Sequence, residues 1–112
     1  MANYVLLFNS YGMGNVAPEL SQLLASNYLK LLNDEMQLPS AILFYAEGVK
    51  LCCSDSFAKE SLEKLESKGV KLLACTTCLN FYESKDKLAV GTMGTMADIQ
   101  MYQIHADKVI TL

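Results

Sequence analysis

Two cysteines separated by two residues, Cys75 and Cys78, are the side chains of this sequence best suited to chemistry. They come at the end of an apolar run, residues 70–75, where a buried strand is expected to pass into a helix. Backbone N–H groups at a helix start stabilise anions, so a thiolate should form readily there and attack sulfur. The spacing predicts a reactive thiol pair. The alternative is two half-buried cysteines that only pack a strand end.

Three further loops should lie at the same edge of the protein as this pair. Ligands of open parallel sheets bind at the carboxyl ends of the strands, and the loops predicted there are residues 10–15, 47–54, 75–82 and 91–95. All four cysteines fall in these loops, because Cys52 and Cys53 follow the second apolar run. The residues expected to line a binding site beside the catalytic thiols Cys75 and Cys78 are Ser10, Gly12, Gly14, Gly48, Thr76 and Thr77.

A structural zinc site is one alternative reading of the cysteines. Zinc prefers four tetrahedral ligands, usually from two well-spaced pairs. The adjacent Cys52 and Cys53 would point apart in an extended chain, and His105, the only histidine, lies in the last predicted helix. We therefore expect no metal.

A dithiol–disulfide redox module is a second alternative. The Cys-x-x-Cys spacing permits it, but thioredoxin-like sites place this motif after the first core strand, whereas Cys75 follows the third.

A third alternative is a phosphate or flavin site on Ser10, Gly12 and Gly14. A Gly-x-Gly alone is a weak signal, and a tight turn explains it equally well. We therefore expect no cofactor.

The composition limits the class of protein that positions these residues. With 112 residues, 52% of them hydrophobic and 19% charged, the chain is expected to fold as a single domain, residues 1–112. Its net charge of −3 and scattered lysines give no basic patch for nucleic acid. No apolar run approaches the ~20 residues of a membrane span, and the N-terminus lacks a signal-peptide pattern. A cytoplasmic protein with reduced thiols is expected.

The hydrophobic pattern predicts an α/β fold. Apolar runs predict strands at 4–8, 41–46, 70–75, 88–90 and 109–112, with a loop at 91–94. Helices are predicted from Pro18 to before Pro39, from about residue 57 to Gly69, and over 95–105, with a short helix or turn after Cys78. The stripe of the first helix expected to face the sheet comprises Leu20, Leu23, Leu24, Tyr28, Leu31 and Leu32. This alternation predicts three α/β/α layers around a five-stranded, mostly parallel sheet with flavodoxin-like layering.

Several segments resemble one family in register along the chain. Residues 74–82 (A-C-T-T-C-L-N-F-Y) resemble the S-C-G-T-C-L-D-F-Y stretch of DsrE-like proteins of the YedF-like branch. Residues 87–91 and 108–112 resemble the same branch's K-L-A-V-G and K-V-I-T-L, and residues 41–44 with 48–51 resemble its T-I-L-F and G-V-K-L. Three segments depart from the pattern: Thr76 replaces the usual glycine, Gly94-Thr95 stands where Thr-Asn is common, and Cys52-Cys53 has no counterpart.

The resemblance implies a homo-oligomer, a trimer or a hexamer, and a role in sulfur or selenium handling. It implies that Cys75 carries the sulfur as a persulfide, with Cys78 as its partner or resolving thiol, although the order could be reversed. YedF-like proteins usually carry an additional TusA-like domain that this sequence lacks. The expected partners are therefore sulfur donor and acceptor proteins, including a separate TusA-like carrier, unless the protein has taken another task.

The function expected from the sequence is sulfur relay, in which a thiolate accepts sulfane sulfur from a donor persulfide and passes it on. This would make the protein a sulfurtransferase in a broad sense, with neither nucleic acid nor membrane as partner. The alternative is a non-catalytic oligomer that binds a small molecule or another protein and whose cysteines are structural.

Overall fold

The computed structural model describes residues 2–112 and leaves only Met1 of the expected domain outside the described part. Its elements in chain order are β1 (Tyr4–Phe8), α1 (Pro18–Asn33), β2 (Ala41–Phe44), the 3₁₀ helix η1 (Ala46–Cys52), α2 (Lys59–Ser67), β3 (Lys71–Cys75), α3 (Thr76–Phe81), the 3₁₀ turn η2 (Lys85–Lys87), β4 (Thr92–Gly94), α4 (Met96–His105) and β5 (Lys108–Thr111).

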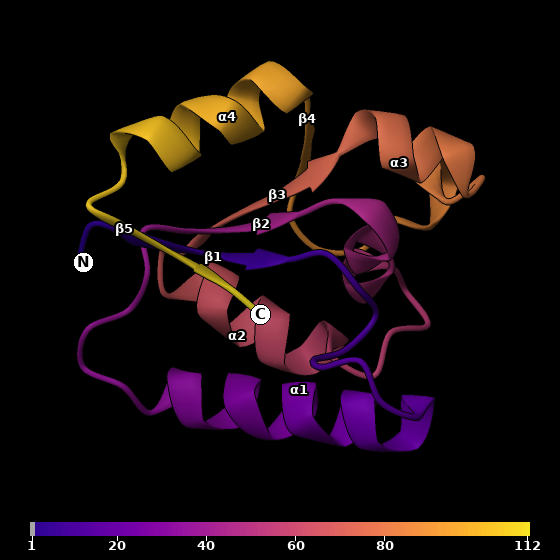
Figure 1. Ribbon diagram of the computed structural model, residues 1–112, viewed down its shortest axis with the longest axis horizontal. Helices are drawn as coiled ribbons and strands as arrows, with labels where there is room; N and C mark the ends of the chain where they lie inside the picture. The colour runs from indigo at the N-terminus through magenta and orange to yellow at the C-terminus, as the bar shows by residue number, and fades with distance from the viewer. Residues whose placement is uncertain (1) are drawn as a thin grey trace.

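All five strands join one sheet in the order β4-β3-β2-β1-β5, and every neighbouring pair is parallel. Helices α1 and α2 cover one side of this sheet, while α3 and α4 lie on the other (Figure 1). The predicted three-layer α/β fold is therefore confirmed. Parallel strands require crossover connections, and the alternation of strands and helices along the chain supplies them.

The core consists of the apolar strands, which are covered from both sides. Val5 to Phe8 in β1 and Ala41 to Phe44 in β2 are all buried, as expected for central strands of a parallel sheet. Phe8 and Phe44, partners in the register of β1 and β2, stack with ring centroids 5.8 Å apart. This rigid centre fixes the positions of the loops that leave the carboxyl ends of both strands.

Helix α1 faces the sheet with a different side from the one predicted. Its buried residues are Ser21, Ala25, Leu29 and Leu32, at spacings of three and four. Of the predicted stripe, Leu32 is buried and Tyr28 packs partly against the core, whereas Leu20, Leu23, Leu24 and Leu31 are exposed. Small residues explain the difference: the backbone around Gly12 approaches Ser21 so closely that a Cβ on Gly12 would overlap the Ser21 side chain. At this contact the small volume of the side chain, and not its hydrophobicity, therefore determines which residue of α1 faces inward.

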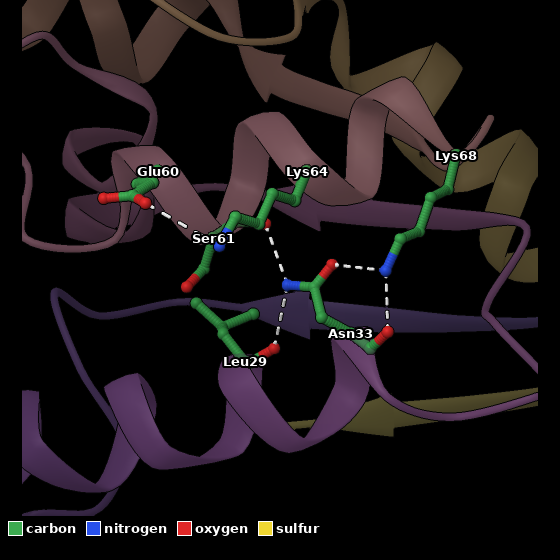
Figure 2. A network of polar contacts seen from close by, with 6 residues as sticks. All are labelled: Leu29, Asn33, Glu60, Ser61, Lys64 and Lys68. Carbon is green, nitrogen blue, oxygen red and sulfur yellow. Dashed lines mark hydrogen bonds and ion pairs between the residues drawn. The ribbon is translucent and has the colours of Figure 1, made fainter.

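Asn33, at the end of α1, ties this helix to α2 (Figure 2). Its Nδ2 donates to the carbonyl oxygens of Leu29, at 3.2 Å, and Ser61, at 3.1 Å. Lys68 Nζ donates in turn to the Asn33 carbonyl oxygen at 2.7 Å. One amide thus links both helices beneath the sheet, because its two N–H groups can serve two carbonyls.

The fourth strand lies four residues beyond its predicted position. β4 spans Thr92–Gly94, inside the predicted loop, while Leu88 forms an isolated antiparallel bridge with Cys53. The Cys52 carbonyl accepts from the N–H groups of Ala89, at 2.8 Å, and Val90, at 3.2 Å. Residues 89 and 90 therefore bond to the end of η1, and the sheet is completed by residues 92–94. Within residues 2–112, no helix is long and apolar enough to cross a membrane.

Candidate functional site

The loops at the carboxyl edge of the sheet are brought together by a close contact between β1 and η1. Tyr45 N–H donates to the Phe8 carbonyl oxygen at 3.1 Å, and a Cβ on Gly48 would overlap that same oxygen. Only glycine allows this approach, which explains the residue at the predicted binding position Gly48. Figure 1 shows η1 and α3 side by side at this edge. Gly48 thus positions η1 and lies buried within its packing.

Cys75 lies where the sequence predicted, at the carboxyl end of β3 and immediately before α3. It is 1% exposed and pairs with Gly94 in the register of β3 and β4. Its sulfur is therefore enclosed by the sheet edge, with no direct route to solvent. Reaction with a large donor would require this edge to open.

Cys78 is the only one of the four cysteines that is not buried. Its Sγ accepts a hydrogen bond from the backbone N–H of Ala46, at an N–Sγ distance of 3.2 Å. Ala46 has a φ of +51°, a left-handed conformation that costs an alanine about 1–3 kcal/mol. Such strain is commonly retained at functional sites.

The pKa of Cys78 differs from the expectation. Partial burial raises the pKa of this thiol above its ordinary value; the Ala46 amide lowers it, whereas the proximity of Cys75 raises it further. The predicted stabilisation of the thiolate is present as one backbone N–H group, but desolvation outweighs it. Cys78 is consequently a thiol at neutral pH and ionises on reaction.

The two threonines of the motif have separate positions. Thr76 Oγ1 donates to the Gly94 carbonyl oxygen at 3.1 Å, so it ties the start of α3 to the end of β4. Thr77 is exposed. Neither caps α3, since Cys75 is the N-cap residue and no side chain bonds to the free amides there. The Thr76 hydroxyl is unavailable for capping because it is engaged by the neighbouring strand.

The glycine loop after β1 folds back onto α1. Ser10 Oγ donates to the Gly12 carbonyl oxygen at 3.1 Å, and Met13 N–H donates to the Ser21 carbonyl oxygen at 3.0 Å. Ser10 and Gly14 line a hollow of about 420 Å³ together with Glu47 of η1. The structure therefore brings this loop beside η1, and the cysteine pair lies outside the hollow.

A second hollow, absent from the sequence prediction, lies between η1 and the segment that follows α3, residues 82–87. This cleft has a volume of about 430 Å³ and is lined by Glu47, Lys50, Cys53, Asp55, Tyr82 and Lys87, among others. A 3₁₀ helix has three residues per turn, so Glu47 and Lys50 follow one another along one side of η1, and Cys53 directly follows the helix. Lys50 Nζ lies 3.1 Å from Glu47 Oε2 and 4.4 Å from the Tyr82 ring centroid. A three-residue period in residues 47–53 was the signal that could have revealed the cleft.

Cys52 and Cys53 occupy unlike environments. Cys52 is fully buried, and burial raises the pKa of its thiol well above the ordinary value. Cys53 Sγ donates to the Val49 carbonyl oxygen at 3.7 Å and forms part of the cleft wall. Across residues 2–112, no cluster of three or more His, Cys, Asp or Glu side chains is arranged to hold a metal ion.

Comparison with solved structures supports the fold. The YchN protein of E. coli superposes with a TM-score of 0.74 at 20% identity, with all of both chains covered. MTH1491 of Methanobacterium thermoautotrophicum, a protein of unknown function, gives 0.71 at 21% identity, again over all of both chains. BT1422 of Bacteroides thetaiotaomicron, also of unknown function, gives 0.64 at 13% identity over 98% of this chain and 95% of its own. At these identities the likeness concerns the fold.

The sequence itself carries the family assignment. No curated protein matches the chain. A family model described as DsrE/DsrF-like, however, matches residues 4–112, which includes every strand and helix and the whole of the cysteine motif. The chain belongs to the DsrE/DsrF-like family.

Proposed function

We propose that this protein is a sulfur-relay protein that carries sulfane sulfur as a persulfide on the Cys75-x-x-Cys78 motif, with Cys78 as the thiol that first accepts the sulfur. Membership of the DsrE/DsrF-like family, which is associated with sulfur relay, supports the general role. The observation that carries the assignment to Cys78 is the 3.2 Å hydrogen bond from Ala46 N–H to its sulfur, on the one cysteine that is not buried.

The transfer step needs only the thiol and a donor. Cys78 first loses its proton, and the Ala46 N–H group stabilises the resulting thiolate. The thiolate then attacks the outer sulfur of a donor persulfide. A sulfur–sulfur bond forms on Cys78 while the donor's sulfur–sulfur bond breaks, and the donor leaves as its own thiolate. No electrons are gained or lost overall, so neither an oxidant nor a reductant is required.

Cys75 has a supporting role in this proposal. It is buried at the end of β3, and its proximity raises the pKa of the Cys78 thiol. This order reverses the one implied by the family resemblance, which places the carrier at Cys75. Burial is the reason: Cys75, which is 1% exposed, meets an incoming persulfide less readily than the partly buried Cys78.

The finer features of the relay follow the family resemblance. We place the chain in the YedF-like branch because of residues 74–82, and we propose a homo-oligomer that exchanges sulfur with carrier proteins in the reducing cytoplasm. The exposed leucines of α1 offer one surface for self-association, since apolar side chains are stabilised when they leave water. Selenium would follow the same displacement chemistry as sulfur.

The decisive experiment compares Cys78→Ser and Cys75→Ser with the unmodified protein. Each reduced protein is incubated with a persulfide donor, and intact-mass spectrometry counts the sulfur atoms added. We expect Cys78→Ser to lose loading and Cys75→Ser to retain part of it. If both variants load like the unmodified protein, the motif is not the carrier and the cysteines are structural. Loss of loading in Cys75→Ser alone would restore the reverse order.

A further inference from the structure

We propose that the cleft between η1 and the segment after α3 binds a small zwitterionic thiol or its persulfide, a compound of the cysteine type with one ammonium and one carboxylate group. This inference rests on the proposed relay function and names a substrate class for it: a free small-molecule donor or acceptor that exchanges sulfur with Cys78. The cleft volume of about 430 Å³ lies within the range of roughly 300–1,000 Å³ typical of small-molecule sites.

The charges of the cleft favour a zwitterion over a simple ion. Two lysines, Lys50 and Lys87, and two acids, Glu47 and Asp55, line it. Lys50 and Glu47 already neutralise each other at 3.1 Å. In the described part of the chain, Lys87 and Asp55 make no ion pair, so one cation and one anion remain available for a ligand. Such a pair matches the carboxylate and the ammonium of an amino acid.

Lys87 and Asp55 are held at the same end of the cleft. Ser54 N–H donates to the Lys87 carbonyl oxygen at 2.9 Å, which joins the segment after η1 to η2. Both charges also act on Cys53: Asp55 raises the pKa of that thiol and Lys87 lowers it, although desolvation is the largest cause of its overall rise. The charged head of a ligand is therefore expected at the Cys53 end.

Cys78 does not line the cleft, but two of the lining residues, Glu47 and Tyr82, adjoin it. Glu47 directly follows Ala46, whose N–H group holds Cys78 Sγ. Tyr82 follows Cys78 by four residues, and its N–H donates to the Cys78 carbonyl oxygen at 3.0 Å. Residues four apart in a helix lie on one side, so Tyr82 and Cys78 are neighbours. A ligand whose head binds Lys87 and Asp55 would extend its sulfur along the Tyr82 ring toward Cys78.

The sulfur transfer within this cleft is balanced. The Cys78 thiolate attacks the outer sulfur of the bound persulfide, the sulfur–sulfur bond of the ligand breaks, and the small thiol leaves as a thiolate that takes up a proton from water. In the reverse direction the small thiolate removes the sulfur from Cys78 and regenerates its thiolate. The cleft thus orients a bimolecular exchange, and proximity of this kind accelerates reactions.

A binding experiment tests the cleft without any sulfur transfer. The reduced ¹⁵N-labelled chain is titrated with S-methyl-L-cysteine, which carries both charges but no transferable sulfur, and amide shifts are followed by NMR. We expect shifts at Glu47, Cys53, Asp55 and Lys87. Methylthiopropionate, which lacks the ammonium, and methylthioethylamine, which lacks the carboxylate, should each bind about tenfold more weakly, the effect of one charge-assisted hydrogen bond.

Matched variants assign the effect to the cleft. Lys87→Ala and Asp55→Asn should each weaken S-methyl-L-cysteine about tenfold. Lys85→Ala and Asp86→Asn, at neighbouring exposed positions outside the cleft, should leave binding unchanged. Equal affinity for all three ligands, shifts confined to other surfaces, or no shifts at millimolar ligand would overturn the inference.

A transfer experiment separates this inference from the proposed function. Lys87→Ala should slow loading of Cys78 from cysteine persulfide and leave loading from a protein-bound persulfide unchanged. If Cys78→Ser loses loading but Lys87→Ala loads from cysteine persulfide at the unmodified rate, the cleft inference fails and the relay stands. If the cysteine variants all load normally while S-methyl-L-cysteine still binds in the cleft, the relay fails.

Discussion

Ala46 and Cys78 are 32 residues apart in the chain, yet the backbone nitrogen of one lies 3.2 Å from the sulfur of the other. This contact joins the first residue of η1 to the middle of α3. It exists because Gly48 lets η1 pack against the end of β1, and because Ala46 adopts a left-handed conformation. Each of these features can be tested separately.

The reactivity of Cys78 should rise with pH. Its pKa is raised above the ordinary value, so the thiolate fraction at pH 7 is small and grows about tenfold per pH unit until the pH exceeds about 9. Iodoacetamide alkylation, followed by peptide mass spectrometry at pH 7 to 10, should modify Cys78 first, since the other three thiols are buried. A rate that reaches its plateau below pH 8 would contradict the raised pKa and restore the thiolate expected at a helix start.

Gly48→Ala should be strongly destabilising. The added methyl group would overlap the Phe8 carbonyl oxygen, and overpacking of this kind costs about 1–3 kcal/mol or more. Gly14→Ala is the matched control, since its methyl group would meet nothing closer than Val16 Cγ2 at 3.8 Å, although its φ of +83° costs about 1 kcal/mol. Urea unfolding of both variants gives the comparison. Equal losses of unfolding free energy in the two variants would mean that η1 can move away from β1.

Asn33→Ala should cost about 1–2 kcal/mol of unfolding free energy. The substitution removes the hydrogen bonds to the carbonyls of Leu29 and Ser61 and disturbs the contact with Lys68 (Figure 2). Asn27→Ala, at an exposed position of the same helix, makes the same change in helix propensity without these bonds. The difference between the two variants in denaturant unfolding isolates the link between α1 and α2. No difference would show that apolar packing alone joins these helices.

The stability of the fold should fall above pH 9 because of Cys52. Burial holds the pKa of this thiol well above 9, so the folded chain keeps a proton that the unfolded chain releases. The unfolded state then binds fewer protons, and stability declines by up to about 1.4 kcal/mol per pH unit as the pH rises through this window. Under reducing conditions, Cys52→Ala should flatten the decline between pH 9 and 10. An unchanged slope would assign the decline to the other groups whose pKa is raised, which are Cys53, Cys78, Tyr4 and Tyr28.

The central strands and their burial could be predicted from the sequence, because a parallel sheet needs continuous apolar runs, as in residues 4–8 and 41–44. The side of α1 that faces the sheet could not be predicted, because Ser21 and Ala25 are buried on account of their small volume. β4 was misplaced since residues 88–90 are as apolar as a strand but bond to Cys52. The position of Cys75 at a strand end could be predicted from the apolar run that precedes it. Its burial could not, because burial depends on tertiary packing.

The cleft escaped prediction for a different reason. Glu47, Lys50 and Asp55 are ordinary surface residues when considered one at a time, and only the three-residue period of η1 and the return of the chain through η2 bring them together. The amide that bonds Cys78 was equally hidden, since a backbone N–H group carries no sequence signal. Residues that act through the main chain are therefore the hardest to recognise.

The pairing of β5 with β1 has a consequence for the integrity of the protein. β5 covers one side of a strand whose residues Val5 to Phe8 are all apolar, and Asn3 Nδ2 reaches the His105 carbonyl oxygen at 3.2 Å to hold the junction. Detachment of β5, by proteolysis or local fraying, would turn β1 into an open edge with unpaired backbone groups. Such an edge is a template for intermolecular strand pairing, so damage at this junction should lead to aggregation while the cysteine edge is still intact.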